Sequence, residues 1–132
     1  MNRSPERGRA LVELLNERTP TSAKLADWSS AFRVPEGTDI IVNATSIGLF
    51  PHLDAQLDIE LDTLQPAMVV ADIIPNPPRT RLIQEAERRG CRVLDGLDML
   101  VNQGVIGIKY WTGVNVDANV MRRTLAGIFS AS

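Results

Sequence analysis

Four short stretches of the chain carry side chains whose types and spacing could bind a small molecule: residues 2–7, 43–48, 73–78 and 96–103. Residues 43–48 combine small hydroxyl and amide side chains with a glycine that permits a tight turn, so their backbone N–H groups could meet a nucleotide. The same composition is also typical of an ordinary polar turn. Hydrolytic chemistry is not indicated, because no Ser-His-Asp set can be assembled around the single histidine, His52.

Two arginines near the start of the chain could bind a dianion. Arg3 precedes a predicted helix over residues 5–16, and Arg7 lies in its first turn. In dinucleotide-binding folds, an arginine in place of the usual acidic residue accommodates a ribose 2′-phosphate through charge-assisted hydrogen bonds. The alternative is that both arginines are ordinary surface charges.

The other two stretches also allow two interpretations. Residues 73–78 contain three prolines, which either stiffen a pocket wall or simply end the preceding strand. Met99 and Gln103 are four residues apart and share a helix face, so an amide would lie beside an apolar contact. That pair suits a polyhydroxylated ring, or else the glutamine is merely solvated.

The elements that must position these residues alternate between strands and helices. Apolar and β-branched runs predict strands at residues 39–43, 68–74 and 91–95, with a weaker candidate at residues 21–26. Further helices are predicted from the Thr80 cap to Gly90, over residues 97–111 and after Asp117. This order predicts a Rossmann-like α/β fold, a mostly parallel sheet with helices on both faces. Ligands bind at the carboxyl ends of such strands, where three of the four stretches fall.

Composition limits the class of protein. The 132 residues, 44% apolar and 23% charged, predict a single domain over residues 1–132. A net charge of −2 argues against a nucleic-acid module. Cys91 is the single cysteine, and the sequence has no zinc-type cluster, so no disulfide or metal site is predicted and a reducing cytoplasm fits. No leader and no membrane-spanning apolar run is present, so no membrane association is expected.

Taken in order, four segments resemble the carboxyl-terminal half of shikimate dehydrogenases: residues 2–7, 39–48, 71–78 and 90–103. The resemblance continues through residues 111–113 to the last predicted helix and covers essentially the whole chain. It implies an NADP-binding portion of an oxidoreductase. The implied reaction is reversible hydride transfer between NADP(H) and a ring substrate, 3-dehydroshikimate to shikimate or a related ring such as quinate.

The resemblance also implies residue roles. In the family an asparagine-arginine-threonine turn and a second arginine grip the 2′-phosphate of NADP. Here these are similar to Asn2, Arg3, Ser4 and Arg7. Further cofactor-side positions are implied for Asn43, Ala44, Thr45, Ser46, Ile73, Gly96 and Met99, and a substrate contact for Gln103.

Two departures from the family pattern change the expectation. Pro75 stands where many members carry a substrate-contacting tyrosine, so a related ring is a serious option as substrate. The family's amino-terminal domain, with its catalytic lysine and aspartate, and its glycine-rich loop have no counterpart here. No catalytic residue is therefore assigned, and a shikimate-like substrate would be shared with the missing domain.

The missing first strands have a structural consequence. They would lie beside residues 40–43, so their absence predicts an apolar, unpaired edge there. We therefore expect a fragment, or a chain that repairs the gap by forming a homo-oligomer or by pairing its terminal strand differently. The alternative function is a noncatalytic nucleotide-binding or protein-interaction module derived from a truncated paralogue.

Overall fold

The computed structural model describes residues 1–130 of the chain, which form two compact units. The first unit comprises Met1–Val34 and Asp58–Glu60, and the second comprises Pro35–Leu57 and the described residues from Leu61 onward. The assignment of all residues to one functional domain stays a prediction. None of the helices in the described part is long and apolar enough to cross a membrane.

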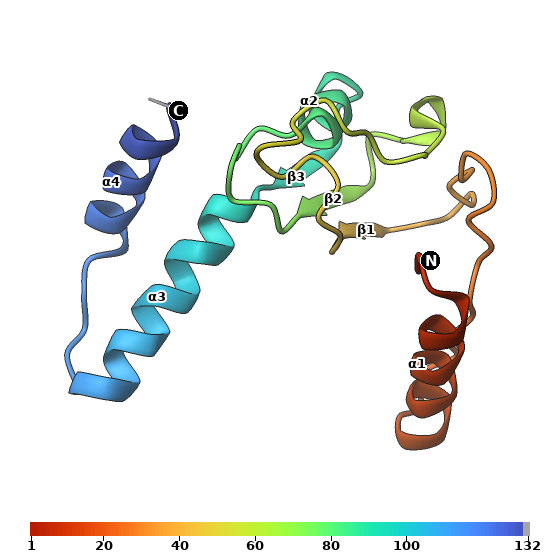
Figure 1. Cartoon of the computed structure of the whole chain (residues 1–132), viewed down its shortest axis with the longest axis horizontal. Helices are drawn as coiled ribbons and strands as arrows, with labels where there is room; N and C mark the ends of the chain where they lie inside the picture. Colours follow the sequence, from red (N-terminus) through yellow and green to blue (C-terminus); the bar gives the residue numbers. More distant parts are fainter. Residues whose placement is uncertain (131–132) are drawn as a thin grey trace. The chain divides into compact units, whose positions relative to one another are not determined.

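A three-stranded parallel sheet organises the second unit (Figure 1). Its strands are β1 (Ile40–Asn43), β2 (Val69–Asp72) and β3 (Arg92–Leu94), in the order β1-β2-β3. Apolar and β-branched side chains favour these extended segments. The three predicted strands and their parallel arrangement are confirmed.

Helices flank the sheet, and their ends follow local sequence signals. They are α2 (Arg81–Arg88), α3 (Gly96–Thr112), α4 (Ala118–Ser130) and the short 3-10 helix η1 (Leu61–Thr63). The Thr80 hydroxyl accepts from the Ile83 N–H, and the Asp95 carboxylate accepts from the Asp98 N–H, so both α2 and α3 are capped. Helix α3 ends at Gly113, whose φ of 74° is left-handed.

The core lies between β2 and α2, which also contacts β3. Its most deeply buried apolar side chains come from β2, from the residues on either side of it and from α2: Met68, Val70, Ile74, Ile83 and Ala86. Helix α3 adds Leu97 and Val101. β2 pairs with both other strands, so the central strand of the sheet is also the one against which this core is buried.

Strand β1 forms an open edge of the sheet. Within the described residues β2 is its partner strand, and no strand precedes it in the chain. The side chains of Ile40 and Val42 are 62% and 57% exposed, although both are apolar. The apolar edge predicted at residues 40–43 is therefore present.

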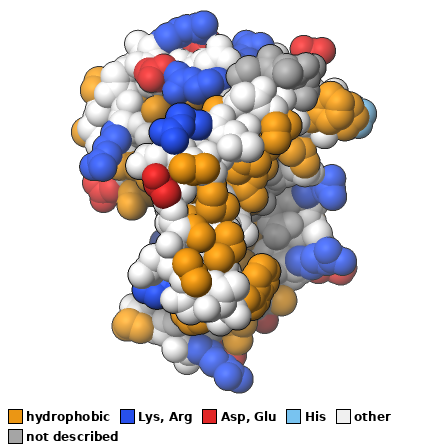
Figure 2. All heavy atoms as spheres, turned by 90° about the vertical axis from the view of Figure 1, so that its left-hand side faces the viewer, with side chains coloured by type: hydrophobic (Ala, Val, Ile, Leu, Met, Phe, Trp, Pro, Cys, Tyr) orange, Lys and Arg blue, Asp and Glu red, His pale blue; other side chains and the backbone are white. Residues whose placement is uncertain are grey.

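Helices α3 and α4 pack on each other, with Gly104 close to the Met121 side chain and Asp98 paired with Arg122. Figure 2 shows hydrophobic side chains along the side of the molecule that these two helices form. The large hydrophobic residues exposed on them include Ile106, Tyr110, Trp111, Val120 and Ile128.

The first unit consists of α1 (Pro5–Arg18) and an irregular segment after it. The helix confirms the predicted start and extends two residues beyond the predicted end. The strand predicted at residues 21–26 is wrong, because that segment is irregular. The Asn16 side chain donates to the Ala23 carbonyl (3.1 Å) and accepts from its N–H (2.6 Å). These main-chain groups are therefore satisfied without a neighbouring strand.

Candidate functional site

The loops after β1 and β2 lie side by side at the carboxyl ends of the strands. The Ile73 N–H donates to the Asn43 carbonyl (3.1 Å) just beyond the ladder. Further out, the Phe50 N–H donates to the Asn76 carbonyl (3.1 Å). The parallel sheet thus brings together two of the stretches singled out in the sequence.

A buried polar cluster lies beneath these loops. Asn43 and Asp72 are paired across β1 and β2, and their exposures are only 4% and 3%. The Asn43 amide nitrogen lies 3.1 Å from both oxygens of the Asp72 carboxylate. The same carboxylate accepts from the Ile74 N–H (3.0 Å) and from the Thr80 hydroxyl (2.8 Å). Both of its oxygens are therefore satisfied by donors of the chain.

The 43–46 loop, made of Asn43, Ala44, Thr45 and Ser46, is closed by its own side chains. The Asn43 amide oxygen accepts from the Thr45 N–H (3.0 Å) and the Thr45 hydroxyl (2.8 Å). The Thr45 hydroxyl in turn accepts from the Ile47 N–H (3.1 Å). Asn43 and Thr45 thus bond inside the chain, whereas Ala44 and Ser46 are exposed. A ligand would meet these two residues and the loop backbone.

Helix α3 begins against the backbone of the loop after β2. A Cβ atom on Gly96 would lie 2.3 Å from the carbonyl carbon and oxygen of Ile74 and 2.6 Å from the carbonyl carbon of Ile73. Only glycine allows this approach. Met99 and Gln103, three and seven residues further, lie on the same helix face and are both exposed. The Ile73 side chain, in the loop against which α3 begins, is also exposed.

The arginine-bearing turn belongs to the first unit. The Asn2 side chain accepts from the Ser4 N–H (2.9 Å), and Pro5 begins α1. No side chain caps this helix start, so the Ser4 hydroxyl stays available. Arg3 and Arg7 are exposed, and neither forms an ion pair with another residue of the described chain.

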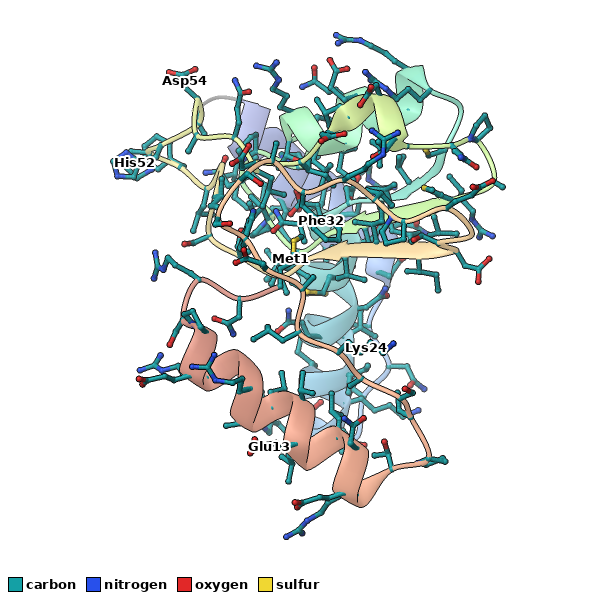
Figure 3. All side chains as sticks on the ribbon, turned by 90° about the vertical axis from the view of Figure 1, so that its right-hand side faces the viewer. Met1, Glu13, Lys24, Phe32, His52 and Asp54 are labelled. Atoms are coloured by element: carbon teal, nitrogen blue, oxygen red, sulfur yellow. The ribbon has the colours of Figure 1, made fainter. Side chains whose placement is uncertain are left out.

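Other reactive residues do not gather into a centre. His52 is exposed and points outward from the loop that follows β1 (Figure 3). Cys91 is buried, its Sγ donates to the Gln65 carbonyl (3.1 Å), and burial raises the pKa of its thiol. Residues 1–130 contain no group of three His, Cys, Asp or Glu side chains placed to hold a metal ion.

Sequence reasoning missed Asp72. The signal that could have found it is a single charged residue inside the otherwise apolar run of residues 68–74. A carboxylate in such a run must find donors in the fold, because its burial without partners is costly. The partners themselves could not be read from the sequence, since Asn43 is 29 residues away.

Comparison with known proteins shows which family the chain resembles. The family model "Shikimate 5'-dehydrogenase C-terminal domain" matches residues 96–126. The shikimate dehydrogenase (NADP(+)) of Shouchella clausii is 38% identical over 125 residues, which are 94% of this chain and 44% of that protein. The enzyme of the same name from Methanocaldococcus jannaschii is 35% identical over 128 residues, again 94% of this chain and 44% of that protein.

Solved structures extend the comparison. The ligand-free 5-ketofructose reductase of Gluconobacter sp. strain CHM43 is 46% identical with a TM-score of 0.89, covering 97% of this chain and 46% of that one. A shikimate 5-dehydrogenase from Listeria monocytogenes, in complex with shikimate and NAD, is 27% identical with a TM-score of 0.75, covering 94% and 44%. The chain spans less than half the length of these relatives. It belongs to the shikimate dehydrogenase family, within which it matches the carboxyl-terminal portion.

Proposed function

We propose that the chain supplies the NADP-binding portion of a shikimate dehydrogenase-like oxidoreductase. Curated relatives that align with 94% of the chain are named shikimate dehydrogenases (NADP(+)), and one solved relative is described in complex with NADP+. The bound nicotinamide would donate or accept the hydride. The residues of this chain bind and orient that cofactor against a small hydroxylated or keto substrate.

One observation carries the choice of NADP over NAD: two unpaired arginines beside an uncapped helix start. Main-chain N–H groups in the first turn of α1 have no side-chain partner, and the helix dipole favours negative charge there. Arg3 and Arg7 add two guanidinium groups, each suited to phosphate oxygens. We assign the 2′-phosphate to these arginines, with Asn2 shaping the turn and the Ser4 hydroxyl as a further donor.

Within the second unit, taken by itself, further residues suit contacts with the cofactor and the substrate. The 43–46 loop presents its backbone with Ala44 and Ser46, while Asn43 and Thr45 hold its shape. The exposed Ile73 side chain suits an apolar contact with the nicotinamide. Gly96 lets α3 start close to that loop, Met99 adds an apolar contact, and the Gln103 amide can donate to and accept from a substrate hydroxyl.

We assign no acid or base for proton transfer to this chain. Hydride transfer to a carbonyl needs a proton donor at the oxygen, and neither the family resemblance nor the contacts described above point to a residue of this chain for that role. More than half of each relative's length lies outside the part that this chain matches. The proposal places the acid–base groups there. Cytoplasmic location and homo-oligomerisation stay predictions.

A second candidate substrate is a polyhydroxy ketone rather than a cyclohexene carboxylate. The 5-ketofructose reductase is more similar to this chain, at 46% identity, than the shikimate-bound enzyme from L. monocytogenes, at 27%. The half-buried Pro75 also offers no hydroxyl where the resemblance expects a tyrosine. Shikimate, quinate and 5-ketofructose are therefore the substrates to compare.

Calorimetry with NADP+ and NAD+ tests the cofactor assignment. Wild-type chain should bind NADP+ more tightly, and Arg3→Ala should weaken NADP+ binding about tenfold, the loss of one charge-assisted hydrogen bond, without changing NAD+ binding. Arg18→Ala, at the other end of α1, removes the same charge and should change neither affinity. Equal affinities for the two cofactors would contradict the proposal.

The absence of an assigned acid or base is tested separately by following nicotinamide absorbance. The isolated chain with NADP+ and shikimate or quinate, or with NADPH and 5-ketofructose, should give no steady turnover. Turnover with any of them would show that this chain contains the acid–base group. Failure to bind either cofactor would instead favour a noncatalytic interaction module.

A further inference from the structure

The Asp72 carboxylate accepts hydrogen bonds from three segments of the second unit. Its donors are the Asn43 amide at the end of β1, the Ile74 N–H in the loop after β2, and the Thr80 hydroxyl at the start of α2. A buried carboxylate persists where donors satisfy both oxygens, as they do here. Its contacts thus reach both loops at the carboxyl ends of β1 and β2.

The direction of each hydrogen bond in this cluster follows from elementary chemistry. The Thr45 main-chain N–H can only donate, so the Asn43 amide must turn its oxygen toward Thr45. That orientation directs the Asn43 NH2 group at residue 72. An ionised carboxylate is a pure acceptor, so Asp72 receives this group on either oxygen.

We propose that Asp72 is a positioning residue for the 43–46 loop, through the amide orientation that it imposes on Asn43. The proposal rests on the cofactor-binding role given to that loop above. With Asn43 held, the Thr45 hydroxyl bonds to it and accepts from the Ile47 N–H, which closes the loop. The loop backbone, Ala44 and Ser46 then face the cofactor in one conformation. The loop loses its conformational entropy on folding, so that loss does not weaken cofactor binding.

Asp72→Asn tests the idea with almost no change in volume. In either orientation the new NH2 group lies against the Asn43 NH2 group, and its other neighbour is the Thr80 hydroxyl, which can accept from it, or the Ile74 N–H, which cannot. Asn43 keeps one acceptor oxygen at residue 72, but its NH2 group now also lies against another donor, so the pairing that orients the Asn43 amide is weakened. The Thr45 and Ile47 amides should exchange faster relative to Val70 on the central strand, and NADP+ affinity should fall about tenfold.

Thr80→Val is the matched control. It removes another donor from the same carboxylate, together with the cap on α2 at Ile83, and it leaves the Asn43 and Thr45 bonds in place. It should lower the free energy of unfolding, while exchange at Thr45 and Ile47 and NADP+ affinity stay at wild-type values. A purely stabilising role for the cluster would instead give the two variants the same effects.

The reciprocal double variant Asn43→Asp/Asp72→Asn supplies a rescue. The new carboxylate at position 43 accepts from the Thr45 N–H and the Thr45 hydroxyl. The new amide at position 72 donates from its NH2 group to that carboxylate, and the oxygen of the same amide accepts from the Ile74 N–H. Slow exchange at Thr45 and Ile47 should return. This variant keeps the test decisive if Asp72→Asn does not fold, because a double variant that folds with fast exchange at both amides would overturn the proposal.

The outcomes separate this proposal from the proposed function. Exchange at Thr45 and Ile47 needs no cofactor, so it decides the loop mechanism even if wild-type chain does not bind NADP+. Unchanged exchange in folded Asp72→Asn, or equal changes in Asp72→Asn and Thr80→Val, overturns the mechanism. Faster exchange in Asp72→Asn with NADP+ affinity equal to wild type overturns the positioning role.

Discussion

Adding one methyl group at Gly96 should destabilise the fold. Helix α3 starts there against the carbonyls of Ile73 and Ile74, and a Cβ atom would lie 2.3 Å from the Ile74 carbonyl carbon and oxygen. Carbon atoms pack best at about 3.5 Å or more, so the gap is short by more than an ångström. Both neighbours are main chain and cannot rotate away. Gly96→Ala must therefore displace α3 or the loop after β2.

The cost can be scaled from known overpacked cores. An inserted methylene typically destabilises by about 1–3 kcal/mol, and a rigid backbone neighbour favours the upper end. We expect Gly96→Ala to lower the free energy of unfolding by about 3 kcal/mol. With a urea slope of ~1.5 kcal/mol/M, the midpoint should fall by about 2 M.

Gly104→Ala provides the control in the same helix. Its Cβ would lie 2.6 Å from the Met121 methyl carbon, which is the free end of a flexible side chain. Movement of Met121 costs little, and alanine favours the helix by about 0.8–1.0 kcal/mol over glycine. Gly104→Ala should unfold within about 1 kcal/mol of wild type.

Urea unfolding followed by circular dichroism measures both variants under one condition. A Gly96→Ala chain whose midpoint matches wild type would show that α3 does not approach the Ile73 and Ile74 carbonyls so closely. Equal losses in Gly96→Ala and Gly104→Ala would refute the distinction between a backbone and a side-chain neighbour. Either result would remove the steric reason for glycine at this site.

Two further predictions concern stability. Gly107→Ala should raise the free energy of unfolding by about 0.5–1 kcal/mol, because its Cβ would lie 3.8 Å from the Trp111 ring, at ordinary contact distance; a lower urea midpoint would contradict this. Burial raises the pKa of the Cys91 thiol above its ordinary 9.0, so the stability from its neutral form is complete below pH 9 and is lost as pH rises through the raised value. The free energy of unfolding of Cys91→Ala should therefore fall less between pH 7 and pH 10 than that of wild type. Urea unfolding at the two pH values measures this, and an equal fall in the two proteins would contradict the prediction.

Much of the fold follows from local patterns. The β-branched runs at β1 and β2 are extended, the Thr80 cap starts α2, and the glycine at position 113 ends α3. Each of these signals acts within a few residues, so it predicts the element without knowledge of distant partners. The irregular segment at residues 21–26 shows the limit, since the Asn16 side chain and not a strand satisfies Ala23.

The sequence by itself determined which four stretches could form the site, because their arginine, hydroxyl, amide and glycine residues are visible without the fold. Only the tertiary structure decided what their side chains do. Parallel pairing places Asn43 beside Asp72, so the asparagine turns inward to a buried carboxylate and bonds to Thr45 in the loop after β1. β1 and β2 are parallel, so a long crossover joins them and no tight turn between them fixes the register that brings these two residues together.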